Sequence, residues 1–128
     1  MIESRPLVAV VDDEASVRAA LMRLLRASSL DCVGFASGEE FLTSLATRRP
    51  DCLVIDLQMS GLNGRDVQRR LAGLARPIPV IIITAHDEPT IREQCLADGA
   101  SAYLRKPLRS GVLIRSIQSA MGFPTEGT

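Results

Sequence analysis

The stretch LVAVVDDE, residues 7–14, decides the fold of this chain and indicates where to look for its site. Its first five residues are apolar, and they run directly into three acids. A short, β-branched apolar run is typical of a strand that is buried on both faces. Because acidic side chains are rarely buried without a partner, the three acids predict that a functional site lies where this strand ends.

Four further apolar runs have the same character, and helical patterns separate them. The predicted strands are 7–11, 32–35, 51–55, 79–83 and 101–104. Apolar residues at helical spacing predict helices at about 15–28, after Ser37, after Gly64, at about 88–97 with Gly99 as the C′ stop, and along the seam Leu113, Ile117 and Met121. Strands that are apolar throughout imply an α/β fold, a doubly wound five-stranded parallel sheet with helices on both faces.

The composition suits one domain with an aliphatic core. The 128 residues are 46% hydrophobic but only 3% aromatic, and 15 basic residues balance 15 acidic ones. A net charge of zero excludes a strong overall attraction to nucleic acid or anionic lipid. No run resembles a signal peptide or approaches the ~20 apolar residues of a membrane helix, so we expect a soluble, cytoplasmic protein.

The cysteines are not spaced as a metal site or as a disulfide framework. Cys32, Cys52 and Cys95 are far apart in the chain, and no pair has CxxC spacing. We expect them to be small buried hydrophobic residues in a reducing compartment rather than ligands or disulfide partners.

Polar residues follow most of the predicted strands. Asp12 and Asp13 follow the first strand, Asp56 the third and Thr84 the fourth, and Lys106 lies just beyond the fifth. Ligands of such sheets bind outside the carboxyl ends of the strands, so we expect these side chains to converge. At ~5 Å and an effective dielectric of ~20, each pair of carboxylates costs about 3 kcal/mol. Mg²⁺ prefers such oxygen ligands and would relieve this repulsion. The alternative for the first two acids is capping of the following helix.

Lys106 is the only lysine among 15 basic residues, the rest being arginine. A compact ammonium differs chemically from a planar guanidinium, so this lysine is a candidate site residue; a codon preference with one exception is the alternative. Beside Mg²⁺, Asp56 could act as a nucleophile toward phosphorus. Lys106 and the metal would neutralise the phosphoryl oxygens, and the Thr84 hydroxyl would hold the new group.

Four motifs, in this order along the chain, give residues 6–121 a resemblance to the receiver domain of bacterial two-component response regulators. They are VVDDE at 10–14, DLQM at 56–59 with Gly61 and Gly64, ITA at 83–85, and KP at 106–107. MSG at 59–61 and ITAH at 83–86 are most similar to receivers of the nitrogen-fixation type. The resemblance implies a flavodoxin-like (βα)5 fold with strand order 2-1-3-4-5, a receiver domain over 1–121 and a flexible tail over 122–128.

The resemblance also implies a role for each site residue. Asp56 would accept a phosphoryl group from a sensor histidine kinase. Asp13 would bind Mg²⁺ directly, Asp12 through water or by shaping the site, and the backbone carbonyl of Gln58 would be a further ligand. Lys106 would pair with the phosphoryl oxygens.

The same resemblance implies a switch. Thr84 would swing toward the phosphoryl group, and Tyr103 would fill the vacated space. The surface formed by the helix at 88–97, the strand at 101–104 and the last helix would change, and a downstream effector, a fused output domain or a second copy in a phosphorylation-dependent dimer would read it. Gln58 and His86 would tune the phosphoryl lifetime. Each of these roles has an alternative. Thr84 would be an ordinary strand-end hydroxyl, Tyr103 a half-buried aromatic with a solvent-exposed hydroxyl, and Gln58 and His86 solvated loop side chains.

Such a domain is a phosphoacceptor that catalyses only its own phosphoryl transfer and dephosphorylation. A second class is a domain of the same fold that recognises a partner without phosphorylation. A phosphatase with an aspartyl intermediate would usually carry acid-x-acid, whereas Asp12 and Asp13 are adjacent. No helix-turn-helix follows the last helix, so direct binding of nucleic acid is not expected.

Overall fold

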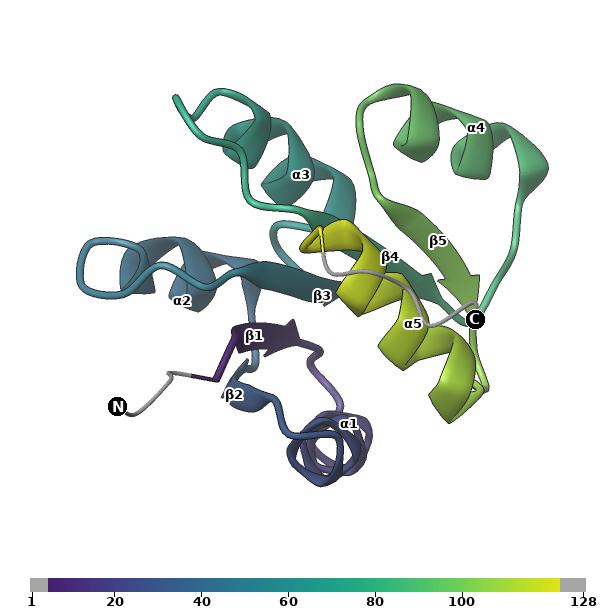
Figure 1. Cartoon of the computed structure of the whole chain (residues 1–128). Coiled ribbons are helices and arrows are strands. Elements are labelled where there is room, and N and C mark those ends of the chain that lie inside the picture. Colours follow the sequence, from purple (N-terminus) through teal and green to yellow (C-terminus); the bar gives the residue numbers. More distant parts are fainter. Residues whose placement is uncertain (1–4, 123–128) are drawn as a thin grey trace.

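Five strands and five helices alternate strictly in the computed structural model, which describes residues 5–122 (Figure 1). The strands are β1 (Leu7–Val11), β2 (Asp31–Phe35), β3 (Cys52–Asp56), β4 (Val80–Thr84) and β5 (Ala102–Arg105). The helices are α1 (Ala15–Ala27), α2 (Gly38–Ser44), α3 (Gly64–Ala72), α4 (Pro89–Ala97) and α5 (Ser110–Ala120). Every predicted strand and helix is present. The predicted tail lies outside the described residues apart from its first residue, Gly122.

The sheet is parallel and has the order β2-β1-β3-β4-β5, which confirms the predicted fold. This order places β1 and β3 side by side at the centre, with Val11 opposite Ile55. The residues that follow these two, Asp12 and Asp56, are therefore brought together by the register of the sheet. Residues at the ends of β4 and β5 lie along the same edge.

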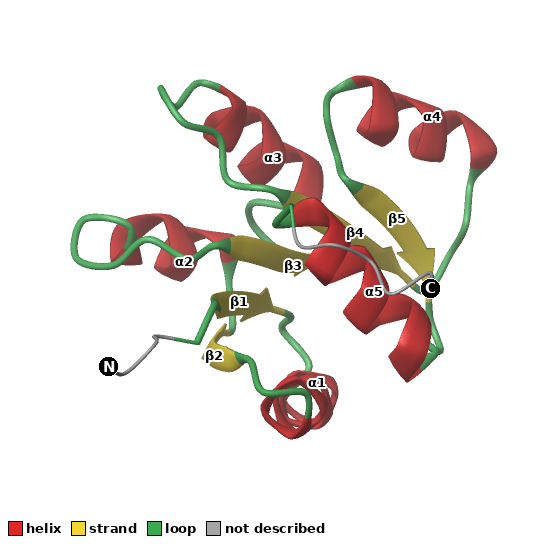
Figure 2. Ribbon diagram, in the orientation of Figure 1, coloured by secondary structure: helices red, strands yellow, loops and turns green. Residues whose placement is uncertain are grey.

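Helices cover both faces of the sheet, as the uniformly apolar strands predict (Figure 2). Helices α2, α3 and α4 pack on one face, through residues such as Phe41, Val67 and Cys95. Helices α1 and α5 pack on the other, where Leu25 and Ile117 are fully buried. Successive residues of a strand alternate between these two layers, so both layers are built from the same five short strands.

Three strands, β3, β4 and β5, begin and end one residue later than the sequence predicts. Asp56 is the last residue of β3 and Thr84 the last residue of β4, because each has a parallel partner on a neighbouring strand. Their backbones are thus fixed by the sheet and not by the loops that follow. Cys32 is only half-buried, contrary to the expectation of burial, because β2 is at the edge of the sheet.

Two helix ends follow local capping rules, the start of α3 and the end of α4. The Asn63 side chain accepts from the Asp66 amide, and the Asp66 side chain accepts from the Asn63 amide, so a capping box begins α3. After α4, Gly99 has a φ of +103°, which confirms it as the residue that stops this helix. Between residues 5 and 122, none of the helices has the length and apolar character required to cross a bilayer.

Candidate functional site

Three carboxylates meet at the carboxyl edge of the sheet. Asp12 and Asp13 follow β1, Asp56 ends β3, and one oxygen of each lies within 4.8 Å of the others. Asp12 is fully buried and Asp56 is 5% exposed, whereas Asp13 is open to solvent. The sequence predicted this convergence. It is an oxygen-only donor set with an accessible side, and it suits a hard divalent cation such as Mg²⁺.

Lys106 reaches this cluster from the loop after β5. Its Nζ donates to Oδ2 of Asp12 at 3.0 Å and lies 3.5 Å from Oδ2 of Asp56. One ammonium therefore partly compensates two buried carboxylates. The peptide bond that joins Lys106 to Pro107 is cis.

Backbone groups fix the two buried carboxylates. Oδ1 of Asp12 accepts from the Glu14 amide at 2.9 Å, and the Asp12 carbonyl accepts from the Arg18 guanidinium at 2.6 Å. Oδ1 of Asp56 accepts from the Gln58 amide at 3.4 Å. Asp12 thus also takes part in the turn that leads into α1, but side-chain capping of the first residues of this helix is absent.

Gly64 brings the start of α3 against the phosphoacceptor candidate. A Cβ at this position would lie 2.8 Å from the Asp56 carbonyl oxygen and 3.0 Å from Cα of Leu57. Both of these atoms are backbone and cannot move aside. Glycine is therefore required here by close approach, and not by a positive φ.

Opposing effects set the pKa of each buried charge. Burial raises the pKa of Asp56, the charge of Lys106 lowers it, and the charge of Asp12 raises it; the net pKa lies above the ordinary value. Burial alone would lower the pKa of Lys106. The hydrogen bond to Asp12 and the charges of Asp56 and Asp12 outweigh burial, so the pKa of Lys106 is raised. The site thus holds a protonated lysine beside a carboxylate whose ionised form is destabilised by burial.

The Thr84 hydroxyl is occupied by the loop that follows β4. It donates to the His86 carbonyl at 3.0 Å and accepts from the His86 amide at 3.1 Å. The side chain is fully buried, and these local backbone bonds are compatible both with a switch residue and with an ordinary strand-end hydroxyl.

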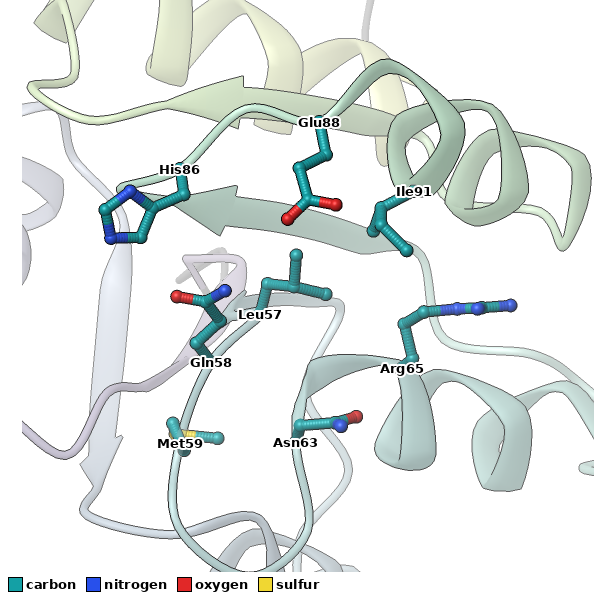
Figure 3. Close-up of a pocket in the computed structure, with 8 residues that line it drawn as sticks. All are labelled: Leu57, Gln58, Met59, Asn63, Arg65, His86, Glu88 and Ile91. Atoms are coloured by element: carbon teal, nitrogen blue, oxygen red, sulfur yellow. The ribbon is translucent and has the colours of Figure 1, made fainter.

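A cavity of about 450 Å³ lies between the loops after β3 and β4, and its lining begins with Leu57 and Gln58, the two residues that follow Asp56 in the chain. Figure 3 shows Gln58 and His86 facing one another at one side of it, with Glu88 and Ile91 on the α4 side and Arg65 on α3. Gln58 and His86 are both exposed. The sequence left two roles open for these residues, control of water access to Asp56 or simple solvation in a loop. Their positions are compatible with both roles.

Tyr103 is more buried than the half-buried aromatic that the sequence left open as the alternative to a switch residue. It is 4% exposed, and its hydroxyl is buried near the backbone of Glu88 in a geometry that falls short of a hydrogen bond. Burial raises the pKa of this phenol. The Arg92 guanidinium of α4 lies 5.8 Å from the ring centroid. The interpretation of Tyr103 as a half-buried aromatic with a solvent-exposed hydroxyl is therefore wrong.

Sequence reasoning missed three residues around the site: Arg18, Arg65 and Gln68. Arg18 supports the Asp12 carbonyl, as described above. Arg65 and Gln68 connect α3 to α4 through residues about 30 positions later in the chain. Only Gln68 gave a signal in the sequence, a polar residue on the apolar face of a predicted helix.

The chain matches known proteins over nearly all of its length. The sequence profile of the response regulator receiver domain matches residues 8–118. Nodulation protein W of Bradyrhizobium diazoefficiens is 36% identical over 91% of this chain, and the DNA-binding transcriptional regulator NtrC of Salmonella typhimurium is 34% identical over the same share. These alignments cover 52% and 25% of the two relatives, so this chain spans about half and a quarter of their lengths.

A solved structure agrees with this match. The crystal structure of a response regulator receiver protein from Burkholderia phymatum is 48% identical, with a TM-score of 0.84, and the match covers 95% of this chain and 99% of that one. Receiver domains of response regulators are signalling domains of two-component systems and not classical enzymes. With a profile match across residues 8–118 and the fold of a solved receiver protein, this chain belongs to the response regulator receiver domains.

Proposed function

We propose that this chain is a phosphorylation-dependent switch in which Asp56 accepts a phosphoryl group from a sensor histidine kinase. The observation that carries this proposal is the convergence of three carboxylates and one lysine at the carboxyl edge of a receiver fold. A purely structural role would not place buried Asp12 and Asp56 beside a third acid, because mutual repulsion opposes folding.

In the proposed reaction, an Asp56 carboxylate oxygen attacks phosphorus of a phosphohistidine. An O–P bond forms, the N–P bond breaks, and the leaving imidazole keeps the electron pair and takes up a proton. Lys106, whose ammonium already lies 3.5 Å from Asp56, stabilises negative charge on the phosphoryl oxygens. Transfer increases the negative charge at Asp56, because the phosphoryl group carries more charge than the carboxylate it modifies, so the neighbouring cation is needed even more after transfer than before.

Asp12, Asp13, Asp56 and the carbonyl of Gln58 would hold Mg²⁺. When bound, Mg²⁺ supplies positive charge that offsets the carboxylates and the incoming phosphoryl oxygens. The fit rests on the donor set described above, three carboxylate oxygens with one open side.

The output requires movement of Thr84. Its hydroxyl must leave the His86 backbone before it can donate to a phosphoryl oxygen on Asp56. That change releases the loop leading into α4, and Tyr103 of β5 lies next to the start of this helix, with the Arg92 guanidinium 5.8 Å from its ring centroid. The surface formed by α4, β5 and α5 then differs between the two states, and we propose that a downstream effector, a fused output domain or a second copy reads it. Gln58 and His86, which line the cavity between the loops after β3 and β4, would set how fast water reaches the phosphoryl group.

Labelling with a small phosphoryl donor tests this proposal. Incubation with acetyl phosphate and Mg²⁺ should add one phosphoryl group, seen as a mass increase of about 80 Da, and Asp56→Asn should abolish it. Asp51→Asn, on the opposite edge of the sheet, is the control and should leave labelling unchanged. Failure of the parent chain to label would favour the alternative, a domain that binds its partner without phosphorylation.

A further inference from the structure

Helix α4 has little apolar packing to hold it. Among its nine residues only Cys95 is buried. Ile91 is partly buried against the core, and Leu96 is 41% exposed. Figure 1 shows α4 at the outer side of the sheet, beyond α3. Burial of one side chain cannot by itself fix the position of a helix, so other contacts must do so.

Two polar side chains of α3 supply those contacts. Arg65 donates from Nη1 to Oε1 of Gln94 at 2.8 Å and from Nη2 to Oδ2 of Asp98 at 2.7 Å. Gln68 donates from its amide nitrogen to the carbonyl of Cys95 at 2.9 Å. In Figure 3, Arg65 leaves α3 on the side where α4 lies. The guanidinium is largely enclosed, with 17% of the side chain exposed against 44% for Asp98.

The two paired charges occupy the wrong ends of their own helices. Arg65 is the second residue of α3, where the positive end of the helix dipole disfavours a cation. Asp98 is the C-cap of α4, where the negative end disfavours an anion. Local helix preferences therefore oppose both residues, and the pairing between helices is the feature of the structure that offsets this.

Some buried polar atoms around α4 also lack hydrogen-bond partners. Three buried side-chain polar atoms have no hydrogen-bond partner within residues 5–122: Nε of Arg65, Oε1 of Gln68 and the hydroxyl of Tyr103. All three surround α4, from α3 on one side and from β5 on the other. Unpaired buried polar groups are costly, so this arrangement of α4 is held in place although part of its interface is unfavourable.

We propose that Arg65 is a positioning residue that latches α4 to α3 through Asp98 and Gln94, and that this latch restrains the movement of α4 that accompanies phosphorylation. The inference rests on the proposed function, because the latch acts on its switch. In the same structure Thr84 is bound to His86 while Tyr103 is already buried, so the latch holds α4 in an arrangement in which Thr84 has not engaged a phosphoryl group. Opening the latch should loosen α4 and make Asp56 accept a phosphoryl group faster.

Hydrogen exchange of the unphosphorylated chain tests the latch itself. Arg65→Ala and Asp98→Ala should each raise exchange of the α4 amides by about two- to fivefold, the range for a partly exposed ion pair. The double variant should exceed neither single variant by much, because the two residues share one interaction. The combination of Arg65→Asp with Asp98→Arg should restore protection, since it re-forms the pair with each charge at a favourable helix end. Arg70→Ala, an exposed arginine of α3 outside any ion pair of the described chain, is the matched control.

Phosphorylation by acetyl phosphate tests the coupling. Both single alanine variants should label faster than the parent by a factor similar to that in exchange, and the charge-reversed pair should return to the parental rate. Unchanged α4 exchange in Arg65→Ala, or faster exchange with an unchanged labelling rate, would overturn the proposal. If the parent does not label at all, the proposed function fails, and α4 exchange alone then decides whether Arg65 positions α4.

Discussion

Replacing Asp13 by asparagine separates metal binding from folding at the candidate site. The Asp13 side chain is exposed and makes no hydrogen bond or ion pair within the described residues. Its removal leaves the buried contacts of Asp12, Asp56 and Lys106 in place. It nevertheless takes away the most exposed carboxylate of the cluster.

The expected magnitude follows from the geometry. At 4.8 Å, the upper limit for the distance between the three oxygens, and an effective dielectric of ~20, each pair of carboxylates costs about 3 kcal/mol. Lys106 offsets part of this, so the cluster keeps an excess of negative charge. A Mg²⁺ concentration one hundred times the Kd should stabilise the parent chain by ~2.7 kcal/mol, which is about 10 °C in Tm for a domain of this size. If loss of one ligand weakens binding about hundredfold, Asp13→Asn should gain only ~0.4 kcal/mol at the same concentration.

Urea unfolding followed by far-UV circular dichroism, with and without Mg²⁺, measures the Mg²⁺-dependent increase in unfolding free energy for the parent and for Asp13→Asn. Sodium chloride at matched ionic strength separates specific binding from screening. Asp31→Asn, an exposed aspartate on β2 outside the cluster, should gain as much as the parent. The reasoning is refuted if Asp13→Asn keeps the full Mg²⁺ gain, or if sodium chloride alone produces it.

Three further predictions concern Asp56, Gly64 and the thiols. The pKa of Asp56 is raised in the folded chain, so its contribution to stability is full below the ordinary aspartate pKa of about 3.9 and is lost as pH rises through the raised pKa. Asp56→Asn should therefore unfold at a higher urea concentration than the parent at pH 7 without Mg²⁺. Identical unfolding curves for the two proteins would contradict this prediction. Gly64→Ala should destabilise by about 1–3 kcal/mol in the same assay, because its Cβ would meet the Asp56 carbonyl at 2.8 Å; Gly73→Ala, where the nearest atom is 3.5 Å away, should not. Burial raises the pKa of Cys52 to about 12, so a thiol reagent at pH 8 should modify the half-buried Cys32 first and Cys52 only on unfolding, with peptide mapping as the measurement.

The sequence by itself determined the fold class and the edge at which the site lies. Apolar runs such as residues 7–11 could be satisfied only by a sheet covered on both faces, and parallel strands bring their carboxyl ends together. Because Asp12, Asp56 and Thr84 each occur at a strand end, their approach followed from the pattern without coordinates. The strand order came from the resemblance to receivers and not from periodicity, which carries no information about neighbours.

Tertiary structure alone decided which partner each group meets. Lys106 lies closer to Asp12 than to Asp56, and 94 positions separate that pair in the chain. The Gly64 requirement, the burial of Tyr103 and the pairing of Arg65 with Asp98 depend likewise on how helices settle on the sheet. Periodicity tells which side of a helix is buried, but the distances between side chains on different elements depend on packing, and local preferences at Arg65 and Asp98 even point the other way.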